Sequence, residues 1–214
     1  KVEVAQLVEE KQITPGLAVI LVGNDPASAT YVASKAKSCK NAGIYSVVHE
    51  MPDSITQDEL LDTINLMNKN PKLDGILVQL PLPKHIDTTT VLEAIHPLKD
   101  VDGFHPYNVG RMVSNLDSFL PATPFGVMRM FEEYGIELSW KNVVVIGSSD
   151  IVEKPMASLL INAKATVTVC NSRTKDLMIS LLYDFIKEDP TRLKSQDFIA
   201  QLSSIQRSNR GIIK

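Results

Sequence analysis

The fold of this chain is first indicated by a continuous apolar run, Leu17-Ala18-Val19-Ile20-Leu21-Val22. An apolar run of this length, bounded by turn residues, is typical of a strand that is buried on both faces of a sheet. The run Gly75-Ile76-Leu77-Val78-Gln79-Leu80 repeats the pattern, and Tyr45 to Glu50 alternates weakly. Helical patterns separate these three candidate strands, so the sequence predicts an α/β fold with a parallel sheet and helical crossovers.

Helical spacing of apolar residues places the predicted helices around these strands. One helix leads in over Val2 to Glu10, and a second follows the turn-like run Gly23-Asn24-Asp25-Pro26 and ends near Gly43. A third covers Thr56 to Asn68, where Thr56 and Glu59 have the spacing of a capping box. A short helix is expected over Thr90 to Ile95.

A second unit is predicted after the proline-rich segment Leu120 to Pro124, which is interpreted as a linker. It opens with a helix over Phe125 to Tyr134 that Gly135 would cap. A β-α-β unit is then predicted. It consists of a strand over Val143 to Gly147, a helix capped by Ser148-Ser149 and running to Asn162, and a strand over Thr166 to Cys170. The helix of such a unit points backbone N–H groups at an anion.

Composition excludes several classes of protein. The chain has 214 residues, enough for one large or two small domains, with 44% hydrophobic and 22% charged residues. The net charge is -3 and no basic stripe is present, so nucleic acid is not an expected partner. No apolar run reaches the roughly 20 residues that span a bilayer. The first residues do not resemble a signal peptide, and because the chain begins without Met, an upstream piece is expected to be missing.

Cysteine and histidine usage argues for a reducing, cytoplasmic setting without a catalytic metal. Cys39 and Cys170 make neither a disulfide framework nor a zinc site, and both are interpreted as buried thiols. The four histidines are scattered without the spacing of metal ligands: His49, His85, His96 and His105.

Tyr31 and Lys35 are four residues apart on a predicted helix and therefore share one face. A flat aromatic ring beside an amine can stack a planar heterocycle and move a proton next to it. The alternative is an amphipathic helix with a tyrosine at the core edge and a solvated lysine.

Polar residues at the end of a buried strand are further candidates. Gln79 ends the third predicted strand, where ligands bind in parallel sheets, and it would orient Lys35 or a ligand, or else satisfy a nearby loop backbone. In the constrained loop that follows, Asp100 is expected mainly to cap turns. Asp102, next to Gly103, suits the N–H donors of an amino-pyrimidine edge.

The residues after the strand over Thr166 to Cys170 indicate which dinucleotide would bind. The residues Asn171 to Lys175 provide hydroxyls and two cations where an acidic residue would bind a free ribose 2′-hydroxyl, so NADP is favoured over NAD. The alternative is a solvated basic turn. The strict G-x-G-x-x-G fingerprint is absent, which weakens the nucleotide signal.

Six motifs in order closely resemble one family, the bifunctional methylenetetrahydrofolate dehydrogenase/methenyltetrahydrofolate cyclohydrolases. The resemblance runs from about Leu17 to Leu177 and rests on Y-V-A-S-K (31–35), G-I-L-V-Q-L-P-L-P (75–83), K-D-V-D-G-F-H-P (99–106), F-L-P-A-T-P-F-G-V (119–127), V-V-V-I-G-S-S-D-I-V-E-K-P-M (143–156) and T-V-T-V-C-N-S-R-T-K (166–175).

This resemblance implies two reactions: hydride transfer from 5,10-methylenetetrahydrofolate to NADP, and hydrolysis of the methenyl product to 10-formyltetrahydrofolate. It implies that Lys35 is the catalytic lysine, that Gln79 is its partner, that Tyr31 stacks the pterin and that Asp102 binds the pterin edge. A free lysine amine is protonated at neutral pH, and burial or a nearby methenyl cation would favour the neutral base. The resemblance further places Val78 and Leu80 in the folate site, and in the cofactor site Gly147, Ser148, Ser149, Ile151, Ser172 and Arg173.

Domain limits and partners follow from the same resemblance. Residues 1–121 would be the folate-binding catalytic domain, a three-layer parallel-sheet unit, and residues 122–177 the start of a Rossmann-like NADP-binding domain. Residues 178–214 would form an atypical tail, with helices expected over Leu181 to Lys187 and Gln196 to Gln206. A homodimer is implied, with tetrahydrofolate derivatives as substrates and neither nucleic acid nor membrane as a partner.

Three departures from the family pattern qualify the dehydrogenase step. Ser148 stands in place of an arginine that helps to hold the 2′-phosphate, and Glu153 in place of a glycine close to the cofactor. Both changes would weaken NADP binding. The third departure is the tail, which lacks the family's later motifs. The alternatives are therefore a cyclohydrolase without the dehydrogenase step, or a non-catalytic interaction protein.

Overall fold

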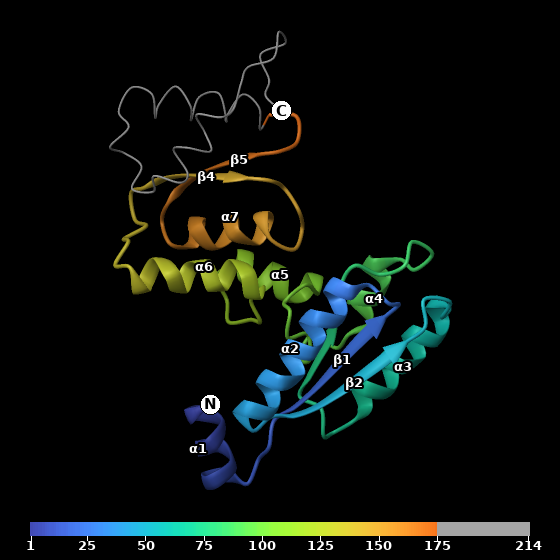
Figure 1. The fold of residues 1–214 in the computed structure, drawn as a ribbon. Helices are drawn as coiled ribbons and strands as arrows, with labels where there is room; N and C mark the ends of the chain where they lie inside the picture. The colour runs from blue at the N-terminus through green and yellow to red at the C-terminus, as the bar shows by residue number, and fades with distance from the viewer. Residues whose placement is uncertain (175–214) are drawn as a thin grey trace. The chain divides into compact units, whose positions relative to one another are not determined.

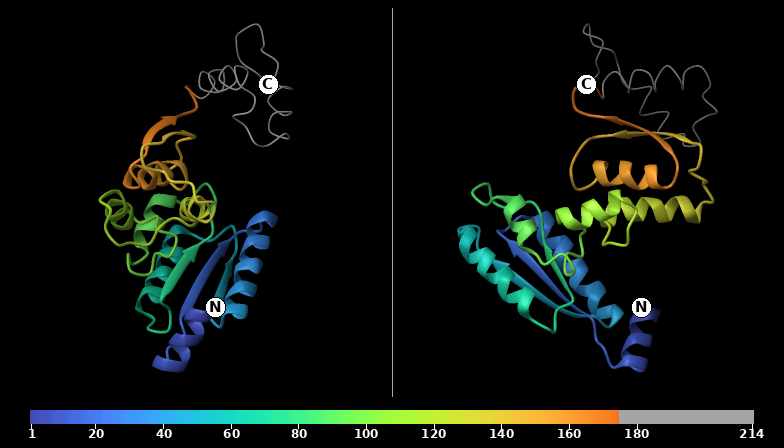
Figure 2. Two further views of the ribbon diagram at one scale, coloured as in Figure 1. Left: turned by 90° about the vertical axis from the view of Figure 1, so that its left-hand side faces the viewer. Right: turned by 180° about the vertical axis from the view of Figure 1, so that it is seen from behind.

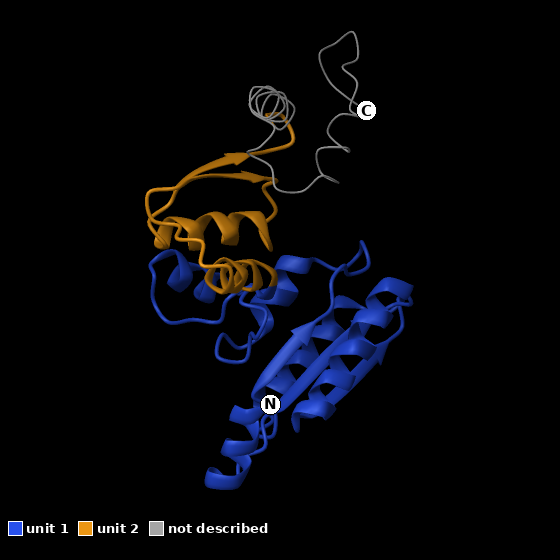
Figure 3. Ribbon diagram, turned by 60° about the vertical axis from the view of Figure 1, so that its left-hand side comes forward, with its two compact units in different colours: residues 1–122 blue, residues 123–214 orange. Residues whose placement is uncertain are grey.

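A computed structural model describes residues 1–174 of the chain. The chain divides into a first compact unit, Lys1–Ala122, and a second that starts at Thr123 (Figure 3). The tail helices expected over Leu181 to Lys187 and Gln196 to Gln206 lie outside the described residues. Within the described part of the chain, no helix is both long enough and apolar enough to cross a membrane.

The first unit is built on a three-stranded parallel sheet with the order β2-β1-β3. The central strand β1 (Gly16–Val22) pairs with β2 (Tyr45–Met51) on one side and with β3 (Gly75–Val78) on the other. The two strands predicted from the apolar runs, and the one expected from the weak alternation of Tyr45 to Glu50, are therefore confirmed. The strand β3 ends at Val78, one residue before Gln79, so Gln79 emerges from the carboxyl end of the sheet.

Helices cover both faces of this sheet and make it a three-layer structure (Figures 1 and 2). Ala18, Ile20 and Val22 of β1 pack into a core with residues of α3 (Gln57–Lys69) and α4 (Thr88–Ala94). The intervening residues of β1 pack on the opposite face against Val32 of α2 (Pro26–Ala42). Because consecutive strand residues point to opposite faces, β1 is apolar throughout, as the sequence indicates.

The ends of the helices follow local capping chemistry. The Asp25 carboxylate accepts a hydrogen bond from the Ser28 amide and begins α2, and Thr56 and Glu59 form the predicted capping box at the start of α3. The leading helix α1 spans Val2–Lys11, close to the prediction. The helix α5 (Pro106–Val113) was not predicted, because Gly103 and Pro106 indicate a constrained loop; in the structure Pro106 occupies the first helical turn instead.

The second unit contains a two-stranded parallel sheet, β4 (Asn142–Ile146) with β5 (Thr166–Cys170). The helices α6 (Ala122–Glu133) and α7 (Glu153–Asn162) contribute to one core with Val145, and Val144 and Ile146 are about half exposed. Two predictions are wrong in detail. The helix α6 already begins within the expected linker, and α7 begins at Glu153 without a serine cap, its N-cap residue being Val152.

We expect the two glycines Gly16 and Gly110 to respond in opposite ways to alanine. A Cβ on Gly16 would lie 1.9 Å from the Lys72 carbonyl oxygen, so Gly16→Ala should lower the free energy of unfolding by about 2 kcal/mol or more. A Cβ on Gly110, inside α5, meets nothing within 4 Å, so Gly110→Ala should raise it by about 0.5–1 kcal/mol. Urea unfolding measures both changes, and equal effects of the two substitutions would contradict this account of the sheet.

Candidate functional site

The centre of the candidate site is a hydrogen bond between two side chains that the sequence analysis singled out. The Lys35 amine, on α2, donates to the Gln79 side-chain oxygen over 3.0 Å. The two residues lie 44 positions apart in the sequence, and the crossover topology brings them together at the carboxyl end of the sheet. Both contacts considered for Gln79 are present, because its oxygen accepts from Lys35 and its side-chain nitrogen donates to a nearby loop carbonyl.

Two further hydrogen bonds hold Gln79 in place, one from its backbone N–H and one from its side-chain nitrogen. Its backbone N–H donates to the Ile20 carbonyl over 2.9 Å, which continues the pairing of β3 with β1 by one residue. Its side-chain nitrogen donates to the Leu80 carbonyl over 2.8 Å, so that its oxygen faces the lysine. The buried Val78 precedes it, and a cis peptide bond joins Leu80 to Pro81. The amide orientation is thus set by bonds to the backbone, and the lysine receives a neutral acceptor.

Tyr31 lies one helical turn before Lys35 and is 64% exposed. It is therefore not a residue of the core edge, which was the alternative interpretation of the Tyr31/Lys35 pair. An exposed aromatic ring next to a positioned amine provides a surface on which a planar group can stack.

Asp100 and Asp102 have different environments although one residue separates them. Asp100 is fully buried and accepts hydrogen bonds from the backbone amides of Phe104 and His105 and from the side chain of Asn108. It braces the loop against α5, which confirms the prediction that it caps a turn. For Asp102, no residue in 1–174 donates a hydrogen bond to the carboxylate, although the side chain is largely buried.

The pKa of Asp102 reflects its burial and the two charged groups near it. Burial raises the pKa of the Asp102 carboxyl to about 6; the nearby Lys35 charge partly opposes the increase, and the Asp100 charge adds to it. The Lys35 amine and the Asp102 carboxylate are thus close enough to influence each other. A partly buried carboxylate without protein donors can bind a ligand that brings paired N–H groups.

In the second unit, the residues predicted for a dinucleotide lie at the carboxyl ends of β4 and β5. Gly147 ends β4 with a φ of 125°, and its N–H donates to the Cys170 carbonyl over 2.8 Å. Ser148, Ser149 and Ile151 form the turn that leads to α7. The Ser149 amide donates to the Glu153 carboxylate over 2.9 Å, and the Ser149 hydroxyl donates to the same oxygen. The sequence analysis placed Glu153 near this turn but did not predict that bond.

The residues after β5 form a hydrogen-bonded turn. The Arg173 amide donates to the Asn171 side chain over 2.9 Å, and the Thr174 amide donates to the Asn171 carbonyl over 3.1 Å. The side chains of Ser172 and Arg173 are exposed. A glycine-ended strand, the start of a helix and an exposed guanidinium fit a dinucleotide phosphate, except that the Glu153 carboxylate occupies the Ser149 amide.

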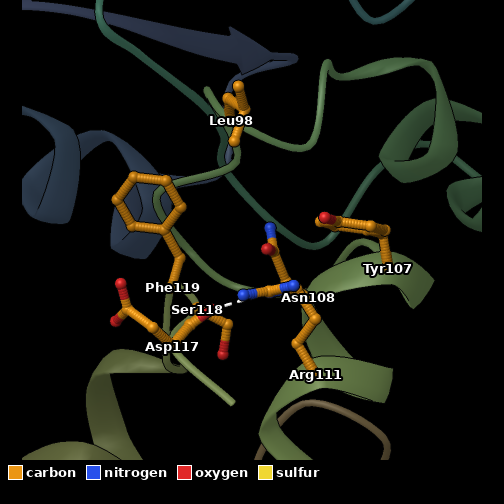
Figure 4. A pocket seen from close by; sticks show the side chains of 7 residues that line it. All are labelled: Leu98, Tyr107, Asn108, Arg111, Asp117, Ser118 and Phe119. Carbon is orange, nitrogen blue, oxygen red and sulfur yellow. Dashed lines mark hydrogen bonds between the residues drawn. The ribbon is translucent and has the colours of Figure 1, made fainter.

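A hollow of about 310 Å³ lies elsewhere in the first unit (Figure 4), and none of the predicted site residues lines it. The Arg111 side chain donates to the Asp117 carbonyl over 2.7 Å, and its guanidinium carbon lies 5.5 Å from the centre of the Tyr107 ring. The lining residues are Leu98, Tyr107, Asn108, Arg111, Asp117, Ser118 and Phe119.

The described residues contain no cluster of metal-binding side chains and no exposed cysteine. No group of three or more His, Cys, Asp or Glu side chains in residues 1–174 is arranged to hold a metal ion. Cys39 and Cys170 are free and buried, which confirms the interpretation of both as buried thiols, and burial raises the pKa of the Cys39 thiol.

Comparison with known proteins places both units in one family. Residues 1–102 match the model of the tetrahydrofolate dehydrogenase/cyclohydrolase catalytic domain. Residues 121–182 match the model of the NAD(P)-binding domain of the same enzymes.

Individual relatives agree with these matches. The bifunctional protein FolD of Aliarcobacter butzleri is 89% identical over 177 residues, which are 83% of this chain and 62% of that protein. The crystal structure of FolD from Campylobacter jejuni superposes with a TM-score of 0.80 at 53% identity, over 84% of this chain and 63% of that one. A Trypanosoma brucei FolD, complexed with NADP cofactor and inhibitor, superposes with a TM-score of 0.79 at 37% identity, over 86% and 62%.

The chain thus spans about 62% of the length of the curated relatives that it matches. The matching part contains the Lys35–Gln79 pair, Asp102 and the glycine-ended strand β4, in the order that the sequence motifs indicate. In the matched parts of both units, this chain belongs to the tetrahydrofolate dehydrogenase/cyclohydrolase family.

Proposed function

We propose that this protein oxidises 5,10-methylenetetrahydrofolate to the methenyl form with NADP and then hydrolyses that product to 10-formyltetrahydrofolate. The observation that carries the proposal is the hydrogen bond from the Lys35 amine to the Gln79 oxygen beside the donor-free Asp102 carboxylate. An amine held by a neutral acceptor next to an open acceptor site suits both proton transfer and pterin binding. This intact arrangement does not favour a non-catalytic protein.

Lys35 would act on the proton of the attacking water in the hydrolytic step. Water adds to the methenyl carbon, one proton leaves, and the bridge opens to the formyl group. Gln79 holds the amine through a neutral acceptor and adds no negative charge of its own. The nearby methenyl cation favours the neutral amine, which can then accept the proton.

The remaining groups of the first unit would position the pterin. Tyr31 stacks one face of the ring and places the one-carbon bridge beside Lys35. Asp102 accepts from the amino edge of the ring, which supplies the donors that the carboxylate lacks in the described structure. Val78 and Leu80 flank Gln79 and contribute the wall at the end of β3.

In the second unit, Gly147, Ser148, Ser149 and Ile151 would hold the dinucleotide phosphates, and Ser172 with Arg173 the 2′-phosphate. The dinucleotide supplies the hydride acceptor when it is bound. A guanidinium that forms two parallel hydrogen bonds to a phosphate favours NADP over NAD. Titration with the two dinucleotides tests this choice, and equal affinities would contradict it.

We also propose that the protein works as a cytoplasmic homodimer without nucleic acid or membrane partners. The net charge of -3 and the family support this assignment. A monomeric mass in light scattering at working concentrations would contradict the dimer.

Lys35→Met is expected to lower the rate of methenyltetrahydrofolate hydrolysis by about 100-fold or more, because the methionine keeps the side-chain length but cannot exchange a proton. The absorbance of the methenyl form follows the reaction. Lys37→Met, on the same helix but exposed, is the matched control and should keep the wild-type rate. Equal rates for the two variants would remove Lys35 from the mechanism, and inert wild-type protein would contradict the proposed function.

Asp102→Asn should have two separate effects, because the ionised Asp102 carboxylate is proposed to bind the pterin and also lowers the free energy of unfolding. The carboxyl has a pKa of about 6 when folded and about 3.8 when unfolded, so its contribution to stability is fully present below pH 3.8 and is lost as the pH rises through 6. The variant should therefore be more stable than wild type at pH 8, by on the order of 2 kcal/mol, and by much less at pH 4.5.

The same substitution should weaken the binding of a folate analogue by about tenfold or more at pH 8, since it replaces an acceptor with a donor. Urea unfolding at the two pH values and equilibrium dialysis measure the two effects. If the variant binds the analogue as tightly as wild type does, Asp102 is not the pterin acceptor.

A further inference from the structure

The turn between β4 and α7 has the backbone of an anion site. Gly147 closes the strand with a φ of 125°, a conformation that L side chains rarely adopt. The amides that follow it, among them that of Ser149, lead into a ten-residue helix, whose N-terminal end carries a positive partial charge. In β-α-β units such a turn receives the phosphates of a dinucleotide.

In this chain the side chain of Glu153 folds back over the turn. A Cβ built on Gly147 would lie 2.6 Å from the Glu153 side chain, so the carboxylate fills the space that the glycine leaves open. The same carboxylate accepts hydrogen bonds from the amide and the hydroxyl of Ser149. A negatively charged group of the protein itself therefore occupies donors that would serve a phosphate.

No ion pair within residues 1–174 neutralises this carboxylate. Lys154, the next residue along the helix, forms an ion pair with Asp150 instead. The hydrogen bond from the Ser149 side chain lowers the pKa of the Glu153 carboxyl, so the group is ionised at neutral pH. A phosphate that approaches the turn must both replace Glu153 at Ser149 and avoid its charge.

We propose that Glu153 sets the affinity of the dinucleotide site by acting as an internal competitor for the Ser149 amide. The dinucleotide binds only when the Glu153 side chain rotates away from the turn, and the cost of that rotation weakens binding. The inference rests on the proposed function only in taking a dinucleotide as the ligand, and it concerns the pyrophosphate rather than the 2′-phosphate.

The test is calorimetric titration of the full chain and its variants. Glu153→Ala should bind NADP about tenfold more tightly than wild type, and Glu153→Gln, which keeps the size of the side chain but not its charge, should show a smaller gain. NAD should gain by the same factor, because both dinucleotides contain the pyrophosphate. Adenosine 2′-monophosphate, which lacks it, should bind wild type and variant equally. Glu137→Gln, an exposed residue of the same unit, removes the same charge and should change nothing.

Several results would overturn the proposal. Unchanged or weaker NADP binding in Glu153→Ala would do so, as would an equal gain in Glu137→Gln, which would indicate a general charge effect. Tighter binding of adenosine 2′-monophosphate by Glu153→Ala would place the competition at the 2′-phosphate rather than at the pyrophosphate. Absence of NADP binding in all variants would exclude the dinucleotide as ligand. Hydrolysis of methenyltetrahydrofolate by the wild type requires no dinucleotide and therefore tests the proposed function separately.

Discussion

The burial of β1 on both faces is the constraint on which the first unit depends. A strand covered on both sides must be apolar throughout, and the helical crossovers α2 and α3 place β2 and β3 beside it in parallel. The parallel arrangement sends all three strands toward the same edge of the sheet. Gln79 leaves β3 at that edge, where Lys35 of α2 is within hydrogen-bonding distance. The contact between Lys35 and Gln79 in the candidate site is thus a consequence of the parallel sheet and its helical crossovers.

Two aspartates illustrate how the same residue type takes opposite roles. Asp100 is satisfied by three donors and stabilises the loop, whereas Asp102 is largely buried with none from residues 1–174. Partial burial of the ionised Asp102 carboxylate lowers stability, and a ligand that brings N–H donors would offset that cost. Glu153 is the reverse case, since its carboxylate finds donors within the protein that a ligand would otherwise use. Counting donors therefore separates structural carboxylates from those available to ligands.

Local patterns predicted most of the fold because they are enforced locally. The apolar runs gave β1 and β3, and the Thr56/Glu59 spacing gave the start of α3. The helix α5 was missed because a proline that breaks a helix and a proline that opens one are identical in the sequence. Helix spacing predicted that Tyr31 and Lys35 share a face, and the strand end placed Gln79 at the ligand edge, but the choice of Lys35 as the partner of Gln79 came from the family resemblance. The position of the Glu153 carboxylate was not, because the choice between solvent and the Ser149 amide depends on the space above Gly147.

The brace formed by Asp100 has a mechanical consequence. Asn108 of α5 donates hydrogen bonds both to Asp100 and to the Pro97 carbonyl, so the start of this helix is tied to the loop that carries Asp102. The His105 amide donates to Asp100 within this loop. A ligand that orders the loop should therefore slow the hydrogen exchange of that amide, which needs no label on the ligand.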